Sequence, residues 1–261
     1  MGQAVIVSAT LIGLLVFLLA FGGAMAGMWL RAVLPAHHIS AASQDTVKIS
    51  IGLIATMTAL VLGLVTASAK SSFDSVEDAI KHTSTDIMAL DRALARYGAE
   101  TKPIRADLAE LIRERVDRIW PQTPSGRSDT DPGRAEALIR GEKIADAVRA
   151  LKPADDLQKA MQQRASDLAE VLLDTRWLAL SADEVAIPAP FLVVMIFWLT
   201  ITFASFGLFA PPNLTVVGAL FLAALSVACA LFLVLELGSP FDGVVKTSPE
   251  PLLRALQRIN L

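Results

Sequence analysis

The run from Lys48 to Lys70, KISIGLIATMTALVLGLVTASAK, constrains this chain more than any other segment. The 21 residues between its two lysines carry no charge. At about 1.5 Å per residue, a helix of that length crosses a bilayer core of about 30 Å. The run therefore predicts a membrane-spanning helix over Ile49–Ala69.

When this run is wound at about 100° per residue, it separates into two faces. One face carries small or weakly polar residues with a lysine at each end: Lys48, Gly52, Ala55, Thr56, Ala59, Gly63, Thr66 and Lys70. The opposite face carries larger apolar residues: Leu53, Ile54, Met57, Leu60, Val61, Leu64 and Val65. The small face fits either a close helix–helix seam or the wall of a narrow path for anions. The sequence leaves both interpretations open.

The rest of the chain predicts an all-α integral membrane protein. Its 54% hydrophobic residues exceed the usual share in soluble proteins. Four stretches are long and apolar enough to cross a bilayer: Ala4–Trp29, Ile49–Ala69, Ile187–Phe209 and Leu214–Leu235. No basic segment precedes the first stretch, so we expect a retained helix and not a cleaved signal peptide. The expected organisation is 1–69 with membrane helices 1 and 2, a cytoplasmic helical bundle over 70–186, 187–237 with membrane helices 3 and 4, and a cytoplasmic tail over 238–261.

The distribution of lysine and arginine predicts the orientation. Four spans place the N-terminus, the 70–186 domain and the tail on one side of the membrane. Near the spans, that side has Lys70, Lys81, Arg176, Lys246, Arg254 and Arg258, whereas the other side has Arg31 and Lys48. Because basic residues beside the spans favour the cytoplasm, we expect both termini and the domain to be cytoplasmic, in the inner (plasma) membrane of a bacterium.

The domain over 70–186 has the pattern of a four-helix bundle. A heptad pattern runs through Phe73, Val76, Ile80, Thr83, Ile87, Leu90, Leu94 and Tyr97. Neither Gly nor Pro interrupts the chain between Gly63 and Gly98, so the second membrane helix is expected to continue into the domain. One further helix is expected to start at Pro103 and another after Pro153, with a third between them, and a loop is expected over Pro121–Gly133.

Catalytic chemistry has little support in the sequence. No phosphate-binding loop, dinucleotide fingerprint, nucleophile elbow or zinc motif is present. The three histidines are His37, His38 and His82, and the adjacent pair diverges on any regular element. The 18 basic and 22 acidic residues of 70–186 form no basic surface for nucleic acid. We therefore expect no enzyme, no cofactor and no metal site.

Two further features lie in the other membrane helices. Gly23 and Gly27 form a GxxxG pair, which is typical of close helix packing. Glu236 is a carboxylate at the end of the fourth span, at the same expected depth as Lys70. It fits a side chain that reaches interfacial water, an ion pair with Lys70, or a gate that coordinates ions.

The blocks LPAHHIS, KISIGLIATMTALVLGLVTASAKSSFD, LDRALARYG, FWLTITFASFGLFAPPN and FLVLELGSPFDG resemble a family of bacterial four-span membrane proteins with a bestrophin-like domain of unknown function. Bestrophins themselves are ring-shaped, mainly pentameric anion channels whose second membrane helix lines the pore. The resemblance thus implies a bestrophin-like layout and a homo-oligomer, with a pentamer favoured by analogy. An aromatic neck is not implied, because the second span contains no aromatic residue.

Two functions follow as expectations. The first is an oligomeric ion channel for small anions, with a path lined by Lys48, Gly52, Thr56, Ala59, Gly63, Thr66 and Lys70. The second is a non-conducting membrane scaffold or signalling protein whose helical bundle binds a protein partner. In the second case the small face is a packing seam, and the lysines only reach the lipid headgroups.

Overall fold

The computed structural model describes residues 9–35, 41–120, 132–181, 189–241 and 244–259, and every regular element among them is helical. Four helices are long and apolar enough to cross a membrane. The chain divides into two compact units. The membrane unit comprises Met1–Phe73 and Val185–Val245, and the bundle unit comprises Asp74–Glu184 and Lys246–Leu261. This agrees with the expected all-α membrane fold.

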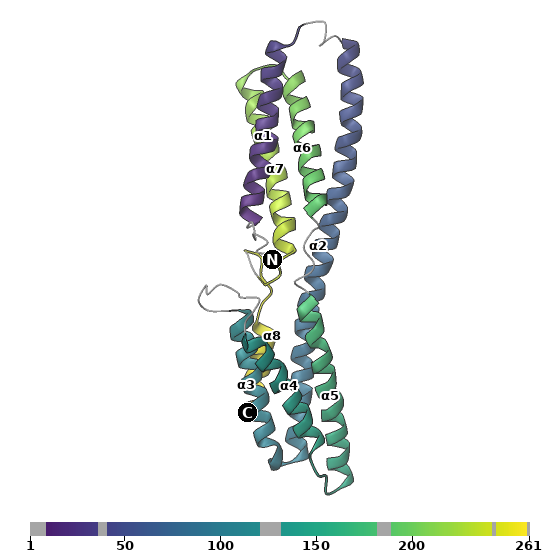
Figure 1. The fold of residues 1–261 in the computed structure, drawn as a ribbon, viewed down its shortest axis with the longest axis vertical. Coiled ribbons are helices and arrows are strands. Elements are labelled where there is room, and N and C mark those ends of the chain that lie inside the picture. The colour runs from purple at the N-terminus through teal and green to yellow at the C-terminus, as the bar shows by residue number, and fades with distance from the viewer. Residues whose placement is uncertain (1–8, 36–40, 121–131, 182–188, 242–243, 260–261) are drawn as a thin grey trace. The chain divides into compact units, whose positions relative to one another are not determined.

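In the membrane unit, helix α1 (Ala9–Val33) is the main packing partner of both α6 (Ala189–Phe209) and α7 (Leu214–Leu237) (Figure 1). The buried residues of α1 form one stripe at helical spacing: Gly13, Val16, Ala20, Ala24 and Gly27. On the facing helices, Met195, Leu199, Ala228 and Leu231 close around Val16. The turn between α6 and α7 ends at Asn213, whose side chain accepts a hydrogen bond from the Val216 amide at 2.8 Å.

The GxxxG pair of α1 packs against α6, as expected. A Cβ atom added at Gly27 would overlap the carbonyl oxygen of Ala204, and one added at Gly23 would lie 2.9 Å from the carbonyl oxygen of Thr200. On α6, Gly207 reciprocates, because a Cβ there would overlap the carbonyl of Ala24. Glycine on both helices therefore lets the two backbones come into direct contact.

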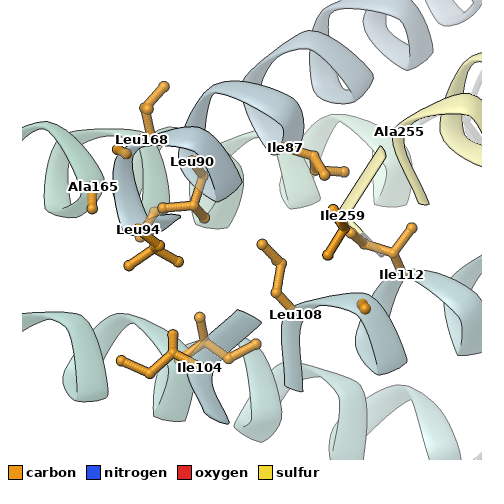
Figure 2. Close-up of a cluster of buried hydrophobic side chains, with 14 of the residues drawn as sticks. Ile87, Leu90, Leu94, Ile104, Leu108, Ile112, Ala165, Leu168, Ala255 and Ile259 are labelled. Atoms are coloured by element: carbon orange, nitrogen blue, oxygen red, sulfur yellow. The ribbon is translucent and has the colours of Figure 1, made fainter. Parts of the chain in front are cut away.

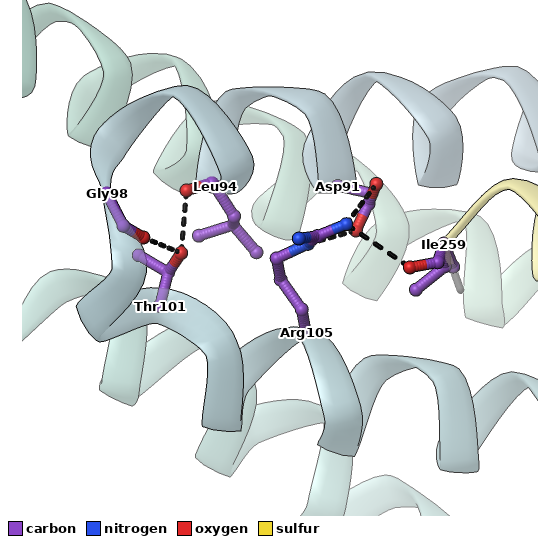
Figure 3. Close-up of polar contacts among 6 residues, drawn as sticks. All are labelled: Asp91, Leu94, Gly98, Thr101, Arg105 and Ile259. Atoms are coloured by element: carbon purple, nitrogen blue, oxygen red, sulfur yellow. Dashed lines mark hydrogen bonds and ion pairs between the residues drawn. The ribbon is translucent and has the colours of Figure 1, made fainter. Parts of the chain in front are cut away.

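Helix α2 (Ala41–Tyr97) is a single helix of 57 residues and contributes to both units. This confirms that the second membrane helix continues without interruption into the bundle. It ends where Gly98 adopts a φ of +149°, a conformation that side chains rarely allow. The short 3-10 helix η2 (Ala99–Thr101) follows, and Thr101 donates hydrogen bonds to the carbonyls of Leu94 and Gly98 (Figure 3).

The bundle unit packs the C-terminal half of α2 with α3 (Lys102–Ile119), α4 (Pro132–Arg149), α5 (Asp156–Ser181) and α8 (Glu250–Ile259). Its apolar core contains Ile87, Leu90, Leu94, Ile104, Leu108, Ile112, Ala165, Leu168, Ala255 and Ile259 (Figure 2). The second half of the heptad pattern in α2 is therefore filled by the same chain. That half is not available as a seam between subunits.

Helix α8 is a fifth element of this core, within the segment expected to be a tail. Leu252, Ala255 and Ile259 are buried. Three side chains of the bundle bond to the backbone of the C-terminal segment: Trp120 to the carbonyl of Thr247 at 2.8 Å, Ser84 to that of Pro251 at 2.6 Å, and Arg105 to that of Ile259 at 3.2 Å. Residues 246–261 thus belong to the bundle unit.

One ion pair connects three helices of the bundle. Arg105 of α3 donates from Nε and Nη2 to the two carboxylate oxygens of Asp91 on α2, at 2.6 and 3.1 Å (Figure 3). The same guanidinium reaches the last turn of α8 at Ile259. Because Asp91 is only 8% exposed, losing this arginine would leave a nearly buried charge without its partner.

Candidate ion path along helix α2

Only one face of the apolar part of α2 is covered by the rest of the chain. Of residues 49–69, two are buried, Thr58 and Ala69, and the partly buried ones are Ile51, Ile54, Ala55, Val61, Leu62 and Val65. At about 100° per residue, all eight lie within about 60° of Thr58. Leu62 packs against the cluster formed by α1, α6 and α7. This inward face includes Ile54, Val61 and Val65, which the two-face division had placed opposite the small face, and also Ala55, which it had placed on the small face.

The small face lies about 110° around the helix from Thr58 and, apart from Ala55, is not covered by the chain itself. Every residue predicted to line a path is exposed: Lys48, Gly52, Thr56, Ala59, Gly63, Thr66 and Lys70. A Cβ atom built at Gly52 or Gly63 meets no atom within 4 Å. The structure thus brings these residues together as one continuous uncovered stripe, as the periodicity predicts.

A third face, about 140° from Thr58 in the other direction, carries the large apolar side chains. These are also exposed: Ile49 76%, Leu53 66%, Met57 48%, Leu60 60% and Leu64 64%. Two of the three faces of α2 are therefore uncovered within one subunit. They differ in chemistry, because one is small and weakly polar whereas the other is large and apolar.

The threonine hydroxyls of α2 bond to their own helix. Thr56 Oγ1 donates to the carbonyl of Gly52 at 2.5 Å, and Thr66 Oγ1 donates to that of Leu62 at 2.7 Å. Each hydroxyl has one proton, so these two groups offer lone pairs and not a donor toward the uncovered side. In this arrangement the small face presents no side-chain donors to an anion between its two lysines.

The two lysines that bound the stripe have different surroundings. The Lys48 ammonium lies 6.0 Å from the centroid of the Phe209 ring, at the end of α6. Nearby, Arg31 Nη1 donates to the carbonyl oxygens of Phe209 and Ala210 at 3.1 and 2.6 Å. Lys70 is exposed at the other end of the apolar run. Both mouths of the candidate path thus carry positive charge.

Glu236 is 5% exposed, and its carboxylate has backbone partners that the sequence did not predict. Its Oε2 accepts hydrogen bonds from the backbone amides of Val244 and Val245, the latter at 3.2 Å. The carboxylate therefore bonds the end of α7 to the backbone at Val244 and Val245. The sequence did not predict this role, because the donors are backbone amides eight and nine residues further along the chain, and no residue type identifies such donors. The predicted pair between Glu236 and Lys70 stays a prediction.

An open cavity of about 330 Å³ lies between α3 and α4 of the bundle unit. Acidic and basic side chains alternate around it: Asp107, Glu110, Ile139, Arg140, Lys143 and Ile144. Arg140 is held there by Glu114 at 2.9 Å. The mixed charge gives no preference for one class of ligand. The His37–His38 pair and most of the Pro121–Gly133 loop lie outside the described residues.

Comparison with known proteins gives one match. A family model described as a Bestrophin-like domain matches residues 18–252, which include most of α1, the other three helices long enough to span a membrane, and most of the bundle. No curated protein and no solved structure matches the chain.

Proposed function

Because the chain belongs to the Bestrophin-like family, we propose that it forms an oligomeric membrane channel for small anions. The path runs along the small face of α2, bounded by Lys48 and Lys70. One observation carries the proposal: in a helix surrounded by its own subunit on one side only, every residue of the lysine-bounded stripe is exposed.

Several subunits are needed to enclose such a path. In the part of the chain that the structure describes, α2 is covered on one face only, so no other helix of the same chain closes the path. A symmetric ring provides the missing walls, because each copy then places the same stripe toward the axis. In that ring the large apolar face of α2, with Leu53 and Leu60, packs against the neighbouring subunit or lipid. A pentamer is favoured by analogy with bestrophins.

The proposed selectivity depends on charge at the mouths and not on donors in the middle. Rings of Lys48 and Lys70 raise the local concentration of anions at each entrance. Between them, Gly52, Ala59 and Gly63 leave the path open and offer no binding site that would hold an ion. With both termini and the bundle in the cytoplasm of a bacterium, Lys70 lies at the inner mouth.

Reconstitution of the purified protein in planar bilayers tests the proposal. Discrete current steps whose reversal potential follows the chloride gradient are the expected result. Lack of conductance at protein densities where nanodisc mass measurements show an intact ring would overturn it. The variant Gly218→Leu on α7 is the matched control for Gly63→Leu on the stripe. Gly218 is also an exposed glycine at which an added Cβ meets no atom within 4 Å, so this variant should conduct like the wild type.

A non-conducting scaffold is the second candidate, and the threonines favour it. Since Thr56 and Thr66 donate to their own backbone, the stripe lacks donors for anions and resembles a face built for close packing. Under this proposal the bundle unit binds a protein partner, and neither function requires a catalytic group. The variant Gly63→Leu separates the two candidates. If the stripe lines a path, the leucine blocks conduction and leaves the oligomer intact, whereas if the stripe is a packing seam, the leucine disrupts the packing.

A further inference from the structure

Two basic side chains from different helices meet at the end of α6. Arg31 lies in the last turn of α1, and Lys48 lies just before the apolar run of α2. Both contact Phe209, Arg31 through the carbonyl and Lys48 through the ring. We propose that Arg31, Lys48 and Phe209 form a binding site for the phosphate group of an anionic phospholipid.

The arginine is held in place by the helix that it caps. Its Nη1 donates to two free carbonyl groups at the C-terminus of α6, at 3.1 and 2.6 Å. Such carbonyls carry partial negative charge, which fixes the guanidinium but offsets only about half of its charge. Among the residues that the structure describes, Nε and Nη2 of Arg31 donate to none, so one edge of the guanidinium remains available.

The lysine adds a second positive charge without a protein anion. Among the described residues, the Lys48 ammonium has the Phe209 ring as its contact and takes part in no ion pair. The carboxylate nearest in sequence is Asp45, which is exposed about one turn away on α2. Two cations gathered at one residue repel each other unless an anion lies between them. A planar fork together with a mobile ammonium is a common arrangement for binding phosphate oxygens.

The position of the site favours a lipid over a free anion. Arg31 and Phe209 lie in the last turns of α1 and α6, and Lys48 lies at the end of the apolar run of α2, where headgroups meet the hydrocarbon core. In the same last turns of α1, Trp29 is 67% exposed and Val33 is 61% exposed. An exposed tryptophan at this depth is typical of the interfacial belt, and the apolar side chains offer contact to the glycerol and acyl groups. Bound there, one lipid would fasten α2 to α1 and α6, and its single negative charge would leave Arg31 and Lys48 with a net positive charge at that mouth of the proposed path.

Native mass spectrometry of the delipidated protein measures the site directly, with phosphatidylglycerol and phosphatidylcholine as probes. We expect the wild type to prefer phosphatidylglycerol, and Lys48→Gln to weaken its binding about fivefold. Arg31→Lys keeps the charge but loses the fork, so it should also weaken binding while preserving the fold. Asp45→Asn should strengthen it. Lys70→Gln, at the other end of the same run, is the matched control and should change binding less than about twofold.

Three outcomes would overturn the proposal: equal retention of the two lipids by the wild type, equal losses in Lys48→Gln and Lys70→Gln, or displacement of phosphatidylglycerol by millimolar inorganic phosphate. The last result would assign the site to a free anion. The readout is lipid retention and not current, so failure of the channel proposal and failure of this one are distinguishable.

Discussion

Helices α1 and α2 carry the same kind of pattern, small residues on one face of an apolar helix, with opposite outcomes. On α1, Gly27 is covered so closely by α6 that a single added Cβ would overlap backbone. On α2, Gly63 has no atom within 4 Å of such a Cβ. The glycine of α1 is thus explained within one subunit, whereas the glycine of α2 is not. Only the second face is left uncovered by the chain itself.

Gly27→Leu should have the largest effect, because it inserts a side chain where two backbones touch. We expect a loss of at least about 3 kcal/mol in the free energy of unfolding, or failure to fold. Thermal unfolding in detergent, followed by circular dichroism, is the measurement. Gly22→Leu is the matched control: it lies on the same helix with no atom within 4 Å and should change stability by less than about 0.5 kcal/mol. Equal losses in both variants would remove the contrast between the helices.

Gly63→Leu tests the α2 side of the comparison, and its effect on the subunit itself should be small. If the stripe lines a path, the particle mass in nanodiscs stays that of the wild type and the current disappears. If the stripe is a seam between copies, the leucine pushes the helices apart and the oligomer dissociates. Gly218→Leu on α7 controls for adding a leucine at an uncovered position. A stable, assembled and fully conducting Gly63→Leu protein would contradict both candidate functions.

The small-residue faces of α1 and α2 could both be predicted from the sequence, but which of them is covered by the rest of the chain could not. The GxxxG pair of α1 and the periodicity of α2 were visible as patterns, and α2 was correctly expected to continue into the bundle. Periodicity separates faces without showing which neighbour covers each one. For this reason Ile54, Val61 and Val65 were grouped with the exposed large residues, although they lie on the inward face.

Two features of the C-terminal region needed the tertiary structure. The amides that bind Glu236 are backbone groups, so no residue type marks them in advance. Helix α8 had a weak signal, since Leu252, Ala255 and Ile259 have helical spacing after Pro251. A ten-residue helix is marginal alone and depends on the core that it enters. That core became visible only when α2, α3 and α8 were placed together.

Lys70→Glu sharpens the comparison at one end of the α2 stripe. In the channel proposal, a ring of glutamates at the inner mouth would replace a ring of lysines. The ratio of anion to cation permeability should then fall by about tenfold, because charge at a narrow mouth sets the local ion concentration. Reversal potentials under a potassium chloride gradient report this ratio. Lys159→Glu, an exposed lysine of α5, makes the same charge change and should leave the ratio unaltered. An unchanged permeability ratio in Lys70→Glu would show that this lysine does not lie at the mouth of an ion path.

The smallest effect is expected for Thr66→Val, which removes a hydroxyl from the uncovered stripe and nearly preserves its shape. The hydroxyl proton is already donated to the carbonyl of Leu62 at 2.7 Å, so a passing anion receives no donor from it. Conductance should therefore change less than about twofold, and the free energy of unfolding by less than about 0.5 kcal/mol. Thr58→Val is the matched control, because Thr58 makes the same bond to Ile54 at 2.7 Å but on the buried face. A large loss of conductance in Thr66→Val alone would show that this hydroxyl rotates toward the ions. The α2 stripe would then differ from the α1 seam in its polar chemistry as well as in its exposure.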